Sequence, residues 1–113
     1  MISKAKLKYL RIAPRKVRIV ADLVRGKQVE DALNILAFTP KKAAEPIAKL
    51  IKSAVSNAEQ IPEAQINIDR LFISHLTVDG GTVFKRFLPR AHGRATKLLK
   101  RTSHITIHLD MKE

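Results

Sequence analysis

The sequence predicts an α+β fold in which three helices pack on one face of a three-stranded antiparallel sheet and two of the strands extend into a long β-hairpin. The middle of the chain carries apolar residues at helical spacing, whereas both ends alternate apolar and polar residues as strands do. Residues 80–103 contain seven Lys or Arg residues and no Asp or Glu, with Pro and Gly near the centre of the run. These three observations together predict a layered body and a projecting hairpin.

A chain of 113 residues supports one domain with a single modest core. We expect a globular body made by about 1–79 and 103–113, and an extended hairpin made by about 80–102. Cysteine is absent, which excludes disulfides, thiolate metal sites and thiol catalysis. The N-terminus lacks the apolar run of a signal peptide, and no segment approaches the roughly 20 apolar residues that cross a bilayer. We therefore expect a soluble protein that is not exported.

Residues 1–26 predict a strand followed by a helix. Lys alternates with apolar residues between Ser3 and Ile12, a pattern typical of a strand with one cationic face. Pro14 suits the first position of a helix, and Gly26 suits its end. The apolar stripe of this helix consists of Val17, Val20, Ala21 and Val24, broadened by Ile19 and Leu23.

Two further helices are predicted between residues 29 and 60. The first of them covers about Val29 to Phe38. Thr39 is a suitable N-cap and Pro40 a suitable first residue for the next helix, which continues to about Gln60. Pro46 lies inside that helix and removes a backbone donor, so we expect a kink or a restart there.

The last part of the chain predicts the two strands that carry the hairpin. The segment from Ile66 to Val78 has the composition of a strand. Residues 104–110 alternate, so Ile105, Ile107 and Leu109 are expected to face the helices and the residues between them to face away. If both strands continue into the basic run, about ten residues project roughly 30 Å from the body.

Positive charge is concentrated at the two ends of the chain. The formal net charge is +12. Residues 1–27 hold nine basic and one acidic residue, residues 28–79 hold five and seven, and residues 80–113 hold eight and two, which gives +8, −2 and +6. This distribution indicates a phosphate-rich partner that binds the ends, while the middle forms an ordinary core.

The residue types at both ends suit a nucleic acid. A guanidinium group grips a phosphate through two hydrogen bonds, and aromatic rings stack on splayed bases. The arginines on one face of the first helix are Arg15, Arg18 and Arg25, with Lys16 close by. The rings of the hairpin are Phe84, Phe87 and His92. We expect affinity to fall steeply with salt through counterion release, and residues 82–100 to order when the nucleic acid binds.

Catalysis and metal binding have little support in the sequence. His104 and His108 would lie roughly 13 Å apart along a strand, too far to share a metal ion. Ser74, His75 and Asp79 contain the residue types of a catalytic triad, yet neighbours on a strand such as Ser74 and His75 point to opposite faces. We expect no enzymatic activity, no cofactor and no metal, and we expect both strand histidines to face solvent or a partner.

Three stretches of the chain resemble the bacterial-type ribosomal protein L-twenty-two family of the large subunit. They are YLRIAPRKVRIVADLVRGK, SAVSNA and LPRAHGRATKLLKRTSHITI, and the resemblance covers essentially the whole chain. It implies a structural protein of the cytoplasmic ribosome that binds large-subunit ribosomal RNA directly and supports subunit assembly and translation. It also implies a body near the mouth of the peptide exit tunnel and a hairpin that lines the tunnel wall.

The resemblance also implies which residues make these contacts. The RNA-binding residues would be Lys4, Lys6, Lys8, Arg11, Arg15, Lys16, Arg18, Arg25, Lys27, Lys85, Arg86, Arg90, Arg94, Lys97, Lys100 and Arg101. The tip that lines the tunnel would be Leu88, Pro89, Arg90, Ala91, His92 and Gly93. The implied partners are large-subunit ribosomal RNA, neighbouring ribosomal proteins and, in passing, the nascent peptide. No membrane and no homo-oligomer are expected.

Two other classes of protein share parts of this pattern. A DNA-architectural protein also uses basic β-arms, but it commonly needs a two-fold dimer, and the helical stripes here are used by the internal core. A protein of anionic membranes would need a basic amphipathic helix with large aromatic anchors, and Trp is absent.

Overall fold

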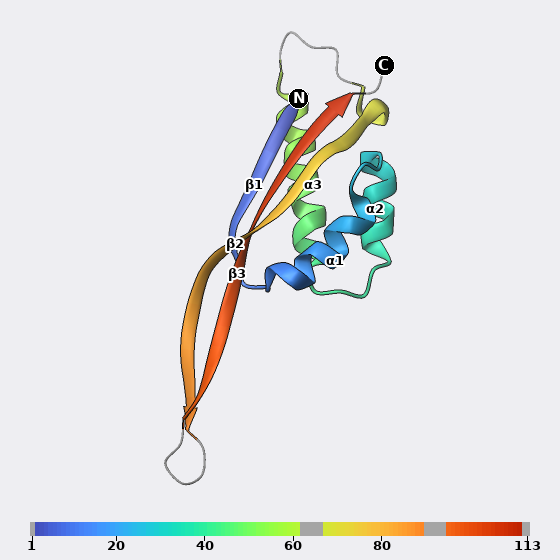
Figure 1. The fold of residues 1–113 in the computed structure, drawn as a ribbon. Helices are drawn as coiled ribbons and strands as arrows, with labels where there is room; N and C mark the ends of the chain where they lie inside the picture. The colour runs from blue at the N-terminus through green and yellow to red at the C-terminus, as the bar shows by residue number, and fades with distance from the viewer. Residues whose placement is uncertain (1, 62–66, 90–94, 112–113) are drawn as a thin grey trace.

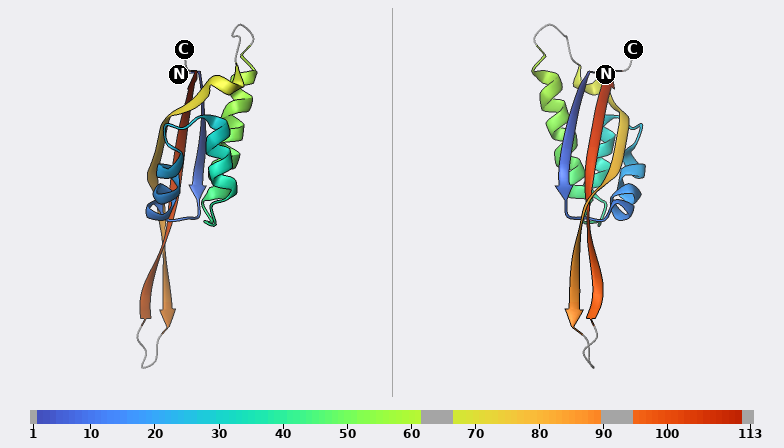
Figure 2. Two further views of the ribbon diagram at one scale, coloured as in Figure 1. Left: turned by 90° about the vertical axis from the view of Figure 1, so that its right-hand side faces the viewer. Right: turned by 60° about the vertical axis from the view of Figure 1, so that its left-hand side comes forward.

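The computed structural model describes residues 2–61, 67–89 and 95–111, and it confirms the predicted α+β fold (Figure 1). A sheet of three antiparallel strands in the order β1-β3-β2 carries three helices on one face (Figure 2). The elements are β1 (Ser3–Leu10), α1 (Pro14–Val24), α2 (Val29–Ala37), α3 (Ala44–Glu59), the short 3-10 helix η1 (Ile68–Arg70), β2 (Leu71–Pro89) and β3 (Ala95–Met111).

The core lies between the central strand and the helices. Ile105, Ile107 and Leu109 of β3 are fully buried, whereas the residues between them are only partly buried, which confirms the predicted alternation. The helices meet these strand residues with fully buried side chains, among them Val17, Val20 and Val24 of α1 and Ile47 and Ile51 of α3. The opposite face of the sheet carries no helix among the described residues (Figure 2).

The apolar stripe of α1 is narrower than the sequence predicts. Ile19 and Leu23 are 55% and 46% exposed, so they do not broaden the buried stripe. The four buried positions of α1 already cover the sector of the helix that faces the core. Ile19 and Leu23 lie beside that sector, where no described element covers them.

The predicted start of the third helix is wrong, and so is the predicted kink. The hydroxyl Oγ1 of Thr39 donates to the carbonyl oxygen of Ile35 at 2.7 Å, so Thr39 closes α2 instead of opening α3. Because α3 begins at Ala44, Pro46 lies in its first turn, where backbone N–H groups have no acceptor within the helix. Pro46 therefore removes no helical hydrogen bond, and α3 continues without interruption to Glu59.

A bulge in β2 changes which residues face outward. The pairing with β3 shifts between Ile73 and His75, which makes Ser74 an extra residue in β2. Ile73 and Leu76 are both buried, whereas Ser74 and His75 are both exposed. The expectation that Ser74 and His75 face opposite ways is therefore wrong. The strand also begins later than predicted, at Leu71, after the turn of η1.

The hairpin leaves the body where β1 ends. β1 pairs with β3 as far as Leu10 opposite Ser103, while β2 and β3 stay paired as far as Pro89 opposite Ala95. The two strands project away from the helices, and the molecule measures 66 × 26 × 16 Å (Figures 1 and 2). Of the predicted tip, Leu88 and Pro89 end β2, and residues 90–93 lie outside the described residues.

Candidate nucleic-acid interface

Arg18 of α1 and Arg25, which directly follows α1, hold the outer edge of β2. The Nε and Nη2 atoms of Arg18 donate to the carbonyl oxygen of Val78 at 3.2 and 2.9 Å. The same two atoms of Arg25 donate to the carbonyl oxygen of Leu76 at 3.0 and 2.9 Å. Each fork thus satisfies a backbone acceptor that an edge strand would otherwise present to another chain.

The sequence did not reveal that these arginines hold the edge of β2. Helical spacing places Arg18 and Arg25 on one face of α1, but it does not show that this face lies against the edge of β2. The Nη1 atom of Arg25 also pairs with Asp22. Both residues are partly exposed, at 43% for the side chain of Arg25, so they can still contact an anion, yet most of their donor nitrogens are used within the protein.

The cations of β1 lie on the open face of the sheet. Lys4 is opposite His108 and Lys6 is opposite Thr106, and both lysines are exposed. The sheet places them away from the helices, on the side that no described helix covers (Figure 2). Asn57 of α3 reaches the edge of the same strand and donates to the carbonyl oxygen of Lys4 at 3.1 Å.

The end of β1 has an irregular backbone that positions His104. Tyr9 has a positive φ of 60°, which is uncommon for a residue with a side chain, and the pairing with β3 shifts between Leu7 and Leu10. The backbone N–H of Tyr9 donates to Nδ1 of His104 at 3.0 Å, and the two rings meet edge to face at 4.9 Å. The Nδ1 atom of His104 is therefore the acceptor in this contact, and Nε2 takes no part in it.

His75 and His108 form a second contact on the open face. Their ring centroids lie 4.7 Å apart, with 30° between the ring planes. Desolvation lowers the pKa of His108, and the charges of His75 and Lys4 lower the pKa further. Both causes disfavour the protonated form of His108. Within the described part of the chain, no three metal-ligating side chains gather into a possible ion site.

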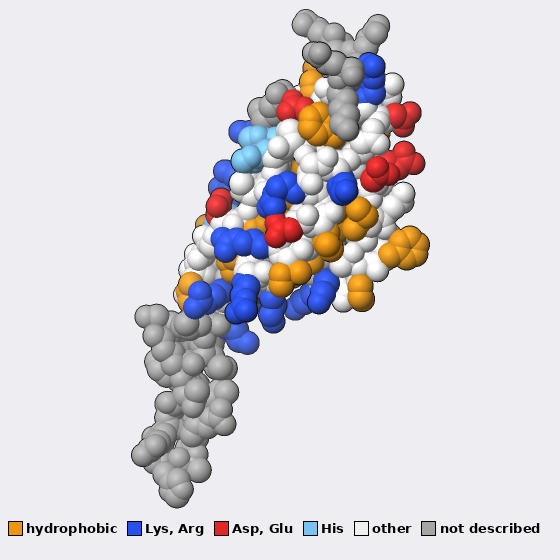
Figure 3. Space-filling model, turned by 45° about the vertical axis from the view of Figure 1, so that its right-hand side comes forward, with side chains coloured by type: hydrophobic (Ala, Val, Ile, Leu, Met, Phe, Trp, Pro, Cys, Tyr) orange, Lys and Arg blue, Asp and Glu red, His pale blue; other side chains and the backbone are white. Residues whose placement is uncertain are grey.

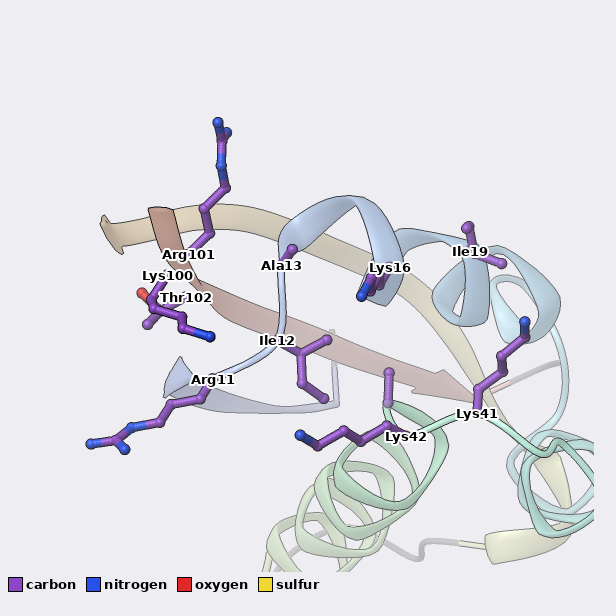
Figure 4. Close-up of a pocket in the computed structure, with 11 residues that line it drawn as sticks. Arg11, Ile12, Ala13, Lys16, Ile19, Lys41, Lys42, Lys100, Arg101 and Thr102 are labelled. Carbon is purple, nitrogen blue, oxygen red and sulfur yellow. The ribbon is translucent and has the colours of Figure 1, made fainter. Parts of the chain in front are cut away.

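Further cations, from the body and from the hairpin, gather where the hairpin leaves the body. Lys and Arg side chains line the lower end of the body, next to the hairpin, in Figure 3. Arg11, Lys16, Lys100 and Arg101 line one groove there, which we call the root groove, with a volume of about 890 Å³ (Figure 4). Arg15 is exposed on the first turn of α1. The fold thus brings together cations that are separated by up to 90 positions in the sequence.

The other predicted RNA-binding residues are placed as follows. Lys8 is exposed near the end of β1, and Lys27 is exposed in the turn after α1, where its carbonyl oxygen accepts from the N–H of Ile73 at 2.9 Å. On the hairpin, the backbone pairs Lys85 with Leu99, Arg86 with Leu98, and Lys97 with Phe87. Arg90 and Arg94 lie outside the described residues.

Known proteins are similar to this chain over nearly its whole length. The family model described as "Ribosomal protein L22p/L17e" matches residues 5–110. The chain belongs to this family. A large ribosomal subunit protein uL22 from Syntrophotalea carbinolica is 56% identical over 112 residues, which cover 99% of this chain and 100% of that protein. The uL22 protein of Geobacter sulfurreducens is 51% identical over 113 residues, which cover 100% of this chain and 100% of that protein. That of Maridesulfovibrio salexigens is 55% identical over 107 residues, or 95% of this chain and 96% of its own.

Family membership confirms the resemblance read from the sequence. The chain is a structural constituent of the large ribosomal subunit and not an enzyme. Its partners are therefore found among the RNA and proteins of that subunit. In the described residues, no helix is both long enough and apolar enough to span a membrane.

Proposed function

We propose that this protein binds large-subunit ribosomal RNA directly, through the hairpin and through the cations at the end of the body from which the hairpin extends. The observation that carries the proposal is the root groove. There the fold gathers cations from the loop after β1, from α1 and from β3, and no Asp or Glu is among the described residues that line it. Each phosphate that these cations neutralise releases counterions, which favours binding.

The contacts divide between the two parts of the chain. The body, about 1–79 and 103–113, contacts RNA through Arg11, Arg15, Lys16 and Lys27, with Arg18 and Arg25 adding long-range positive charge. The hairpin, about 80–102, contacts RNA through its seven cations. The cationic face of β1 meets either RNA or a neighbouring ribosomal protein on the open side of the sheet.

The hairpin tip, 88–93, lines the peptide exit tunnel, and the body lies near the mouth of the tunnel. The length of the molecule supports this arrangement, since a shape of 66 × 26 × 16 Å lets one end stay at a surface while the other reaches deep into RNA. The relatives' names place those proteins in the large subunit. In this position the nascent peptide passes the tip, and the body meets neighbouring ribosomal proteins.

Binding of the full chain to large-subunit ribosomal RNA, measured over a series of salt concentrations, tests the proposal. Six or more phosphate contacts predict a plot of log affinity against log salt with a slope of about −4 or steeper. Duplex DNA of equal length serves as the competitor, and sedimentation at low salt gives the oligomeric state. A dimer that prefers duplex DNA would support the architectural class of protein and contradict RNA binding.

A further inference from the structure

The root groove contains two lysines that the sequence pattern did not single out. Lys41 and Lys42 lie in the loop between α2 and α3 and line the groove together with Lys16 of α1 and Lys100 of β3. In Figure 4, Lys42 and Lys100 extend toward the interior of the groove from opposite sides, and Arg11 extends away from it beside the end of β1. A lysine pair in sequence is usually a solvated surface feature, and only the fold places this pair across a groove from other cations.

The loop that carries Lys41 and Lys42 is held in place on both sides. The N–H of Lys41 donates to the carbonyl oxygen of Thr39 at 2.9 Å, and the N–H of Ala44 donates to the carbonyl oxygen of Lys41 at 3.1 Å. Ala43 and Ala44, which follow the lysines, are only 3% and 4% exposed. A loop anchored in this way keeps the backbone of both lysines in place, so a ligand has to order only their side chains.

The positive charges of the groove are not neutralised by acidic residues within the described part of the chain. Six cations line it, and none of them forms an ion pair with a described acidic residue. The ion pairs between described residues lie elsewhere, at Arg25 with Asp22 and at Lys49 with Glu45. Ordinary protein surfaces intersperse both signs, so six like charges around one hollow repel one another until an anion enters.

The size of the groove indicates what kind of anion fits. A volume of about 890 Å³ lies near the upper end of the roughly 300–1,000 Å³ found for ligand pockets, which is far more than one phosphate needs. Ile19 adds apolar surface beside the cations, since it is 55% exposed, whereas Ile12 is only 8% exposed. Several cations beside apolar surface suit a sugar-phosphate chain, in which charged phosphates alternate with less polar sugars.

We propose that the root groove holds a segment of the sugar-phosphate backbone of ribosomal RNA, with Lys41 and Lys42 as phosphate ligands. The inference rests on the proposed function and extends it to residues that the sequence analysis left out. A strand in this groove contacts the body at Lys16, Lys41 and Lys42 and the hairpin at Lys100 and Arg101. It therefore fixes the direction in which the hairpin leaves the body.

A pair of double variants with equal charge tests the groove. Lys41→Gln with Lys42→Gln removes two groove cations, while Lys49→Gln with Lys52→Gln removes two exposed cations from α3. Binding of the full chain to large-subunit ribosomal RNA is titrated between 50 and 200 mM salt. We expect the groove variant to bind at least tenfold more weakly at about 0.1 M salt, with a salt slope shallower by about 1.4 to 1.8, because each lost phosphate contact changes the slope by about 0.7 to 0.9. The α3 variant should show a much smaller change in both quantities.

The outcomes separate the groove from the proposed function. If the wild-type protein binds the RNA with a steep salt slope but the two double variants behave alike, RNA binding stands and the groove inference is overturned. If the wild-type protein does not bind the RNA, both fail. Lysine acetylation of the wild-type complex, followed by mass spectrometry, gives a result that does not depend on a variant's folding. Protection of Lys41 and Lys42 but not of Lys49 supports the groove, and equal labelling with and without RNA contradicts it.

Discussion

The same two strands, β2 and β3, behave differently in the body and in the hairpin. Within the body, β3 lies between two strands and its inward side chains, such as Ile105 and Ile107, are fully buried under the helices. On the hairpin side of Ser103, where β1 has ended, the paired strands β2 and β3 project away from all three helices (Figure 1). A two-stranded ribbon without a covering layer is marginally stable in water, whereas a covered sheet folds by itself. We therefore expect the body to supply the stability of the fold and the hairpin to depend on a partner for its own stability.

The largest expected effect comes from removing a core side chain of the body. Ile107→Ala should lower the free energy of unfolding by about 2–5 kcal/mol, because it leaves a cavity under the helices. Lys85→Gln on the hairpin should change it by less than about 0.5 kcal/mol. Urea unfolding of the free proteins measures both. Equal losses would mean that body and hairpin share one cooperative core.

The junction between the two regions can be tested at neighbouring glycines. A Cβ added to Gly81 would lie 2.5 Å from Oγ1 of Thr102, which itself donates to the carbonyl oxygen of Thr82 at 2.8 Å. A Cβ added to Gly80 meets nothing within 4 Å among the atoms described. Gly81→Ala should therefore cost about 1–3 kcal/mol of stability by forcing Thr102 to move, and Gly80→Ala should cost far less. Thermal unfolding compares the two variants, and equal melting temperatures would rule out a tight junction at Gly81.

Two arginines, Arg15 in the first turn of α1 and Arg25 directly after α1, allow the edge-holding role to be tested. Arg25→Lys keeps the charge but loses the fork that donates to the carbonyl oxygen of Leu76. It should lower the free energy of unfolding by about 0.5–1.5 kcal/mol. Arg15→Lys is the matched control, since Arg15 is exposed at the opposite end of α1, and its stability should stay within about 0.5 kcal/mol of wild type. Denaturant unfolding gives both values, and an unchanged Arg25→Lys variant would contradict the edge-holding role.

The smallest expected effect is a pH dependence from the open face of the sheet. The pKa of His108 is lowered by desolvation and by His75 and Lys4, while Asp110 opposes the shift. A histidine whose folded pKa lies below its unfolded value of about 6.5 binds its proton more readily when unfolded, so stability falls as pH drops below about 6.5. His108→Gln should remove part of this slope. Unfolding measured between pH 5 and 7 tests it, and a slope unchanged by the substitution would exclude His108 as a source.

Most of the fold could be predicted because periodicity and charge are local properties of the sequence. The alternation of Ile105, Ile107 and Leu109 identifies the buried face of β3 without any knowledge of its neighbours. The predictions were wrong where the local structure depends on a contact with another residue or strand. Thr39 is a good N-cap by type, but the carbonyl oxygen of Ile35 is within its reach and Thr39 closes α2 instead. Ser74 could not be recognised as a bulge, because the shift depends on the pairing with β3.

For the candidate site too, local features could be predicted from the sequence, whereas features that depend on packing could not. The concentration of cations in the hairpin and near α1 is visible in the sequence, so the class of partner could be predicted. The edge-holding role of Arg18 and the position of Lys42 in the root groove were not visible, since both depend on how distant segments pack. Placing single residues therefore required the fold, whereas the class of partner could be predicted from the sequence.

Amide hydrogen exchange of the free and RNA-bound protein measures the difference between body and hairpin most directly. The account predicts slow exchange at Ile105, Ile107 and Leu109 in both states. It predicts fast exchange in the hairpin strands, 83–89 and 95–101, in the free protein, with strong protection once large-subunit ribosomal RNA is bound. Strong protection along both hairpin strands without RNA would contradict it, because the hairpin would then be stable without a partner.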